Sequence, residues 1–170
     1  GGGLCVACEV ASGWGVGGGL AGAWGGAVRH GLVDGVHGRA LMGAGDGNDG
    51  MNLVGAEGRG ESVWMAFFLV EVLTQFAPLA RSHADLAFAE LCEHEAEGLR
   101  TRIEASAWDG AWYRRAWFDD GTVLGTAANT ECRSDSSAQS WSVLSGSAPR
   151  ARWPRAHATR AQHSVYRGTR

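Results

Sequence analysis

The sequence predicts an all-α fold that also contains one long glycine-rich loop and one short β-hairpin. Residues 61–77 are apolar on nearly every side, and residues 84–103 place apolar side chains three or four positions apart, as helices do. The turn signals Asp109-Gly110 and Asp120-Gly121 flank an aromatic stretch that suits a strand. At 170 residues, the chain has roughly the length of one domain.

The two helical segments predict an antiparallel pair. Residues 61–77 lack a polar stripe, which indicates a buried helix, and Pro78 is expected to end or kink it. Ser82 and Asp85 form an S-x-x-D capping box for the next helix. The short joint favours antiparallel packing. One face of the second helix collects the apolar residues Ala84, Phe88, Cys92, Ala96, Leu99 and Ile103.

Shorter elements are predicted downstream. Tyr113–Phe118 is aromatic enough for a strand, and the following Asp-Gly turn makes it the first half of a hairpin. Residues 127–138 predict a loop, and Gln139–Leu144 begins a further apolar segment.

Composition excludes several classes of protein. The chain is 45% hydrophobic and 19% charged, which is ordinary for a globular protein. Its formal net charge of −3 argues against general binding to nucleic acid or membrane surfaces. Apolar runs stay shorter than ~18 residues, so we expect no membrane span and see no secretory signal. Four cysteines do not make a disulfide scaffold.

The two ends differ from the middle. Residues 1–26 are rich in glycine and show no period of 2 or 3.6, so we expect them to be disordered. Residues 149–170 hold six of the fifteen arginines and no acidic residue, and we expect this basic tail to be disordered as well. Either end could be a shifted-frame translation of GC-rich DNA. The scattered arginines form no recognisable nucleic-acid-binding motif, so no nucleic-acid partner is predicted.

The candidate chemistry lies in the loop of residues 34–62. Loops longer than ~12–15 residues in compact domains are usually functional or disordered. Here Asp46, Asn48 and Asp49 fall within four positions. Closely spaced carboxylates raise one another's pKa, which can keep one protonated as an acid.

Three metal or cofactor patterns fail on inspection. A calcium loop counted from Asp46 needs glycine at its sixth position, where Met51 stands. The glycines of Gly13-x-Gly15-x-x-Gly18 lack the helix that a dinucleotide site needs. Cys5-x-x-Cys8 is half of a zinc site. We therefore predict no metal and no cofactor.

Several motifs in a fixed order carry a family resemblance. The stretches GVHGRALMGAGDGNDGMNLVGAEGRGESVWMAFFL and WDGAWYRRAWFDDGTVLGTAANTECRSDSSAQSWSVLSG resemble the cellobiose-phosphorylase-like family, glycoside hydrolase family 94, formerly glycosyltransferase family 36. Within it, the phosphorylase-like C-terminal part of cyclic β-1,2-glucan synthases is especially similar. The resemblance implies that residues 27–148 are part of an (α/α)6-barrel catalytic domain, cut from a larger enzyme.

That family implies a reaction and a general acid. Phosphate attacks the anomeric carbon with inversion while one carboxylic acid protonates the departing oxygen, so inorganic phosphate is the implied co-substrate. An inverting hydrolase needs a second carboxylate to activate water, whereas phosphate is already a nucleophile. The family motif Asp-Trp-Asn-Asp-Gly places the acid on Asp49 and assigns Asp46 and Asn48 to the sugar. Gly47 stands where the motif has tryptophan, which removes an aromatic surface.

Further substrate-binding residues follow from the matched segments. They are Arg59 and Glu61 in GRGES, Arg115 in the aromatic strand and Gln139 in QSW. Other interpretations stay open: Glu61 could face the dipole of a helix N-terminus, and Arg115 could be a solvent-facing cation. Trp141 could be plain core.

The chain also departs from the family pattern. Ser134 and Ser137 stand where isoleucines are usual, and Arg39-Ala40 replaces Leu-Pro of the usual H-G-L-P-L. The family's phosphate-holding histidine lies beyond the matching region.

The sequence therefore predicts a fragment of a carbohydrate-active enzyme that makes or phosphorolyses β-glucosidic bonds. Its predicted partners are a β-glucan or β-glucoside oligosaccharide and the remainder of the parent enzyme. We expect the fragment alone to be inactive and to expose apolar surface. The alternative is a non-catalytic helical interaction protein derived from such an enzyme. The implied location is the cytoplasm, or the cytoplasmic face of the inner membrane as part of a larger synthase.

Overall fold

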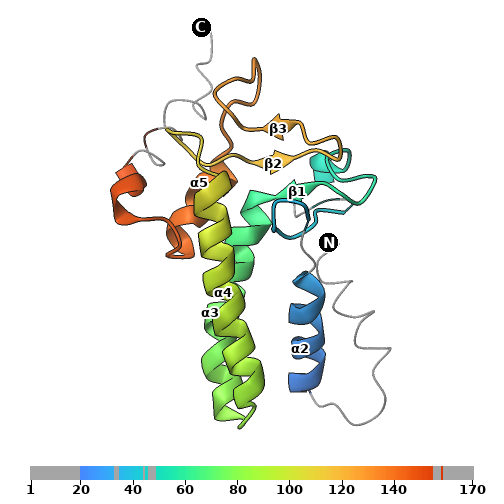
Figure 1. Ribbon diagram of the computed structural model, residues 1–170, viewed down its shortest axis with the longest axis vertical. Helices are drawn as coiled ribbons and strands as arrows, with labels where there is room; N and C mark the ends of the chain where they lie inside the picture. Colours follow the sequence, from blue (N-terminus) through green and yellow to red (C-terminus); the bar gives the residue numbers. More distant parts are fainter. Residues whose placement is uncertain (1–19, 33–34, 44, 46–48, 155–157, 159–170) are drawn as a thin grey trace, which may run out of the picture.

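The computed structural model describes residues 20–32, 35–43, 45, 49–154 and 158. Two long antiparallel helices form its axis, with a third helix alongside and a small sheet at one end (Figure 1). The elements in chain order are α2 (Leu20–Gly31), the 3-10 turn η1 (Asp49–Met51), β1 (Glu61–Ser62), α3 (Val63–Ser82), α4 (Leu86–Ser106), β2 (Ala116–Trp117), β3 (Val123–Leu124), α5 (Ser136–Leu144) and the 3-10 turn η2 (Arg150–Arg152). The predicted mostly helical class and the antiparallel helix pair are confirmed.

Helix α3 is the centre of the core. Its N-cap is Ser62, whose hydroxyl accepts a hydrogen bond from the Met65 N–H at 3.1 Å. The helix passes through Pro78 to Ser82, so of the two expected effects of Pro78, ending the helix is wrong, and kinking it stays a prediction. Pro78 lies exposed in the last turns of the helix, while its neighbours Ala77 and Ala80 are buried. This packing offsets the hydrogen bond that proline cannot donate.

Helix α4 begins at a different cap from the predicted one. Ser82 is the last residue of α3, and the chain reverses through His83 and Ala84, which adopts a positive φ of 61°. Asp85 is the N-cap and accepts from the Phe88 N–H at 3.1 Å. The predicted apolar face is otherwise confirmed, since all its residues are buried except Ala84, which lies in the turn.

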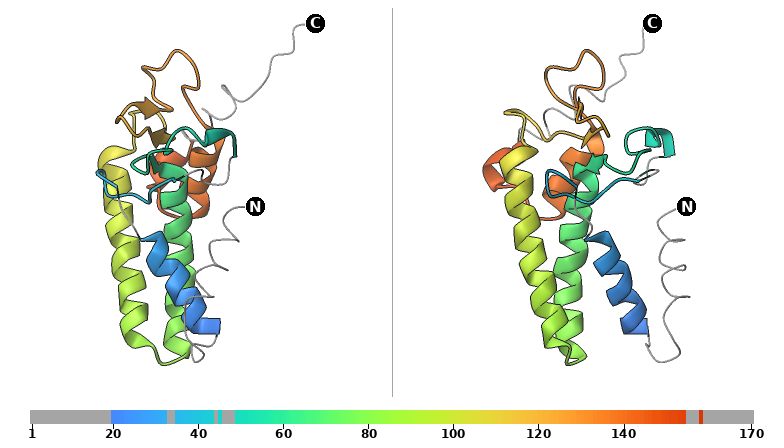
Figure 2. Two further views of the ribbon diagram at one scale, coloured as in Figure 1. Left: turned by 90° about the vertical axis from the view of Figure 1, so that its right-hand side faces the viewer. Right: turned by 45° about the vertical axis from the view of Figure 1, so that its right-hand side comes forward.

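Helix α2 starts inside the segment that was expected to be disordered. It packs beside α3, as both views of Figure 2 show, and buries Val28 in the core. The Arg29 guanidinium lies over the Phe88 ring, 4.8 Å from its centroid. Tertiary packing thus supports a helix whose glycines give it little propensity of its own. Residues 1–19 lie outside the described residues.

The sheet has three two-residue strands in the order β1-β2-β3, all antiparallel. The predicted hairpin is β2–β3: Phe118 N–H donates to Thr122 O at 2.8 Å, and Gly121 takes the positive φ of 84° that its turn requires. Strand β1 uses Glu61 and Ser62, which were expected to start the helix.

The chain after the hairpin packs against the end of α3 that carries the sheet. Helix α5 begins at N-cap Asp135, whose carboxylate accepts from Ser137 N–H at 2.9 Å. Beyond α5, the first residues of the expected disordered tail are ordered. Trp153 packs against the core, and Arg152 forms an ion pair with Glu104. Residues 155–157 and 159–170 lie outside the described residues.

One helix bears on the expectation that the chain has no membrane span. By length and composition, α3 could cross a membrane. A buried core helix passes the same test, and α3 packs against three other helices, so this is weak evidence for a span.

Candidate functional site

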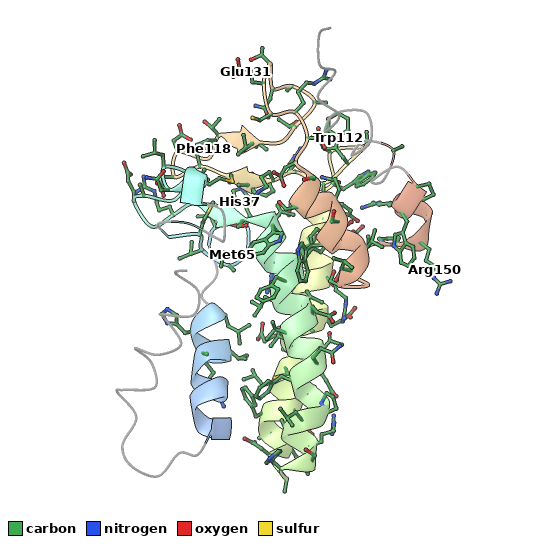
Figure 3. The ribbon with its side chains drawn as sticks, turned by 180° about the vertical axis from the view of Figure 1, so that it is seen from behind. His37, Met65, Trp112, Phe118, Glu131 and Arg150 are labelled. Atoms are coloured by element: carbon green, nitrogen blue, oxygen red, sulfur yellow. The ribbon has the colours of Figure 1, made fainter. Side chains whose placement is uncertain are left out.

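A cavity of about 360 Å³ lies between η1, the β2–β3 hairpin and the segment before α5. Met51, Leu53, Val54, Phe118 and Leu124 make its apolar wall, and Gly50, Arg115, Cys132, Ser134 and Asp135 complete it. Figure 3 shows Phe118 at the loop-and-sheet end of the molecule, above the long helices. Three segments therefore meet here, and the η1 segment lies far in sequence from the other two.

Arg115 and Asp135 supply the charges of this cavity. The Arg115 side chain is 3% exposed, and its Nε lies 3.4 Å from Asp135 Oδ1. Its Nη1 donates to Ser62 Oγ at 3.1 Å. The interpretation of Arg115 as a solvent-facing cation is therefore wrong. Asp135 Oδ1 has two roles, because it lies beside Arg115 and also accepts from Ser137 N–H as the N-cap of α5.

The proposed general acid lies in a turn that reaches the cavity. Asp49 is the first residue of η1, and the next two, Gly50 and Met51, line the cavity wall. The structure describes the backbone of Asp49 but not its side chain. Asp46 and Asn48 lie outside the described residues, so the structure places neither of them.

Glu61 lies in a buried ion network instead. It is 1% exposed, and its Oε1 accepts from the His37 main-chain N–H at 2.8 Å. The same oxygen lies 3.0 Å from His37 Nδ1, and Oε2 accepts from Arg39 Nη1 at 3.2 Å. Glu61 directly precedes the N-cap of α3, but these bonds turn its carboxylate toward the loop of residues 37–39. It is not among the described residues that line the cavity.

The other predicted binding residues also lie away from the cavity wall. Arg59 is exposed and pairs with Glu57 at 2.5 Å. Gln139 is buried and bonds both main-chain groups of Tyr113, accepting from N–H at 2.9 Å and donating to the carbonyl at 2.7 Å. Trp141 packs edge-on against Phe68, with ring centroids 5.2 Å apart, as a core residue would. No three metal-ligating side chains gather among the residues that the structure describes.

Comparison with known proteins decides the family. Residues 26–166 match the catalytic domain of the glycosyl hydrolase 94 superfamily. The chain belongs to this superfamily. The match begins one residue before the predicted domain start and continues into the predicted tail. The family resemblance is confirmed, and the mostly helical fold agrees with part of a glycosyl hydrolase 94 catalytic domain.

Relatives in this superfamily are carbohydrate-active enzymes. The chain is 48% identical over 122 residues to the cyclic beta-(1,2)-glucan synthase NdvB of Rhizobium meliloti, which covers 72% of this chain and 4% of that protein. It is 38% identical over 112 residues to the 3-O-beta-D-glucopyranosyl-beta-D-glucuronide phosphorylase of Paenibacillus borealis, covering 66% and 15%. It is 34% identical over 113 residues to the N,N'-diacetylchitobiose phosphorylase of Vibrio furnissii, covering 65% and 14%. The chain thus spans a small part of each relative.

Of the residues that line this cavity, sequence reasoning proposed only Arg115 and missed, among others, Asp135 and Phe118. Asp135 carries a usable signal, because an acidic residue just before an apolar segment is typical of a helix N-cap. Phe118 carries no sequence signal beyond its place in an aromatic strand. Their meeting with the η1 turn depends on contacts between distant segments, which local patterns do not encode.

Proposed function

We propose that this chain is the part of a glycosyl hydrolase 94 enzyme that carries the general acid for making or phosphorolysing a β-glucosidic bond. Asp49 is the proposed acid. The observation that supports this most is the turn Asp49–Met51, which carries the family's acid position and lines a cavity with its next two residues. A volume of about 360 Å³ suits a small ligand.

The proposed reaction needs only one protein acid. Inorganic phosphate attacks the anomeric carbon from the opposite face, and Asp49 gives its proton to the leaving oxygen. No cofactor is proposed. Phe118 in the cavity wall would supply an aromatic surface, which matters because Gly47 replaces the motif's tryptophan.

We further propose that the chain works as a fragment of a longer enzyme. It spans 4% to 16% of the relatives it matches. The remainder of the parent enzyme would supply the phosphate site, and a β-glucan or β-glucoside oligosaccharide is the proposed substrate. The proposed location is the cytoplasm or the cytoplasmic face of the inner membrane.

Sugar binding by the chain itself tests this proposal. We expect saturable binding of a β-1,2-linked glucose disaccharide, followed by saturation-transfer NMR. Asp49→Ala should weaken binding about tenfold through loss of a hydrogen bond to the sugar. Asp120→Ala, on the exposed hairpin turn, is the matched control and should bind like the original chain. A folded chain that binds no β-glucoside, or an Asp49→Ala variant with full affinity, contradicts the proposal.

The second candidate is a non-catalytic helical interaction protein. Its support is an apolar surface on the described helices, where Phe68 is 42% exposed and Leu144 is 65% exposed. The loss of the motif tryptophan at Gly47 points the same way. A folded chain without sugar binding would favour this candidate.

A further inference from the structure

We propose that Asp119 is a positioning residue that fastens the acid-bearing loop to the β2–β3 hairpin and so sets the place of the Asp49 turn at the cavity. This inference rests on the proposed role of Asp49. Asp119 follows β2 in the hairpin turn, and the loop of residues 49–60 lies beside that turn (Figure 1).

The Asp119 carboxylate collects three main-chain donors from the loop. Its Oδ2 accepts from Glu57 N–H at 2.8 Å. Its Oδ1 accepts from Arg59 N–H at 2.8 Å and from Gly60 N–H at 2.9 Å. Hydrogen bonds to an ionised acceptor are about twice as strong as neutral ones. One side chain therefore fixes the backbone of three loop residues that lie about 60 positions away in sequence.

The main chain of Asp119 adds two more bonds to the same loop. Asp119 N–H donates to Val54 O at 3.0 Å, and Arg59 Nε donates to Asp119 O at 3.1 Å. The residue thus holds the loop at both ends of the stretch from Val54 to Gly60. Close packing supports the same geometry: a Cβ at Gly60 would lie 2.4 Å from Val54 O, so the loop backbone approaches itself closely there.

Val54 connects this fastening to the η1 turn. Its N–H donates to Met51 O at 3.1 Å, and its side chain is 4% exposed. Val54 is buried with Met42 and Ala116, and Met51 packs against that cluster. Met51 and Val54 both line the cavity. Two hydrogen bonds therefore lead from Asp119 to the turn that begins at Asp49.

Main-chain hydrogen bonds favour the ionised form of the Asp119 carboxylate. The Glu57 N–H contributes most to holding the pKa of Asp119 below its ordinary value; burial is the next largest effect and opposes it, and the Arg59 and Gly60 N–H groups add smaller lowering effects. Arg59 adds a favourable charge. The other charged groups nearby are Glu57 in the loop and Asp120 in the same turn.

Asp120 offers a matched control because its bonds stay inside the hairpin. Its carboxylate accepts from Thr122 N–H at 2.8 Å and has no described bond to the loop. The two neighbouring aspartates therefore separate two effects of a lost carboxylate. Asp119→Ala removes the three side-chain bonds to the loop and keeps the two main-chain bonds, while Asp120→Ala removes only a local turn bond.

Hydrogen exchange on the whole chain, combined with sugar binding, tests the inference. In Asp119→Ala we expect amide exchange at residues 50–60 to rise about tenfold, while exchange in α3 and α4 stays unchanged. The affinity of Asp119→Ala for a β-glucoside should fall as its loop exchange rises. Asp119→Asn should recover part of both, since its amide oxygen can still accept from Arg59 and Gly60. Asp120→Ala should match the original chain in both measurements.

The possible outcomes separate this inference from the proposed function. If Asp119→Ala leaves exchange at residues 50–54 unchanged, the inference is overturned. It is also overturned if the loop exchanges faster while sugar affinity stays at its original value. If the original chain binds no sugar, the proposed function fails, and exchange at residues 50–54 still decides whether Asp119 positions the turn.

Discussion

Arg39 shows how burial and pairing compete at a single residue. Its side chain is fully buried, and burial lowers the pKa of Arg39 to about 10, although the charge of Glu61 and the bond to it act in the opposite direction. The guanidinium stacks on Trp117, 4.1 Å from the ring centroid, but Nε has no hydrogen-bond partner among the described residues. A buried pair of this kind is weak evidence for net stability, whereas removing one partner is costly.

A double-mutant cycle across this pair tests that balance. Arg39→Leu and Glu61→Gln should each lower the free energy of unfolding by about 3 kcal/mol, because each leaves a buried charge without the opposite charge of this pair. The double variant should lose less than the sum, with a coupling of about 1–3 kcal/mol in urea unfolding. The exposed pair Arg81 and Glu93 is the control and should show far weaker coupling. Additive losses at Arg39 and Glu61 would contradict the prediction.

At the scale of elements, the sequence located the helices better than their ends. The spacing of apolar residues located α3 and α4, because in each helix the regularly spaced apolar residues are the ones that the structure buries. The start of α4 was placed wrongly because Ser82 and Asp85 both suit an N-cap, and the choice between them depends on where the chain reverses. In the structure, the Ser82 hydroxyl instead donates back to Leu79 O at 2.7 Å.

Two alanine variants distinguish these caps. Asp85→Ala should lower the free energy of unfolding by about 1 kcal/mol, because the Phe88 N–H loses its partner. Ser82→Ala should change the free energy of unfolding much less, since the Ser82 side chain caps no N-terminal N–H group of α4. Urea unfolding of both variants measures the difference. A loss at Ser82 equal to that at Asp85 would restore the capping box that the sequence predicts.

At the scale of the whole molecule, the sequence could not predict which segments meet. The network around Glu61 joins residues 22 and 24 positions apart in sequence, and the cavity joins the η1 segment to a hairpin that lies far from it in sequence. Helix α2 was missed for a similar reason, because packing rather than propensity supports it. The family motif nonetheless pointed to the loop whose turn reaches the cavity, since the order of its residues needs no contact information.

The exposed apolar surface is a property of the whole molecule that the sequence did predict. Phe68 and Leu144 are exposed on α3 and α5, and the Phe68 ring packs against Trp141 and Trp64. We expect the chain to bind an apolar fluorescent dye at this surface, because contiguous apolar area favours such binding. The double variant Phe68→Glu, Leu144→Glu should lower dye fluorescence severalfold at equal protein concentration.

Leu86→Glu provides the control for this experiment. Leu86 is 57% exposed and is the first residue of α4, at the opposite end of the helix pair from the sheet (Figure 1) and so away from Phe68 and α5. It should therefore change dye binding much less than the double variant. Equal losses in the two proteins would show that the dye responds to general exposure. In that case the aromatic surface on α3 and α5 would not be the site where the chain meets an apolar partner.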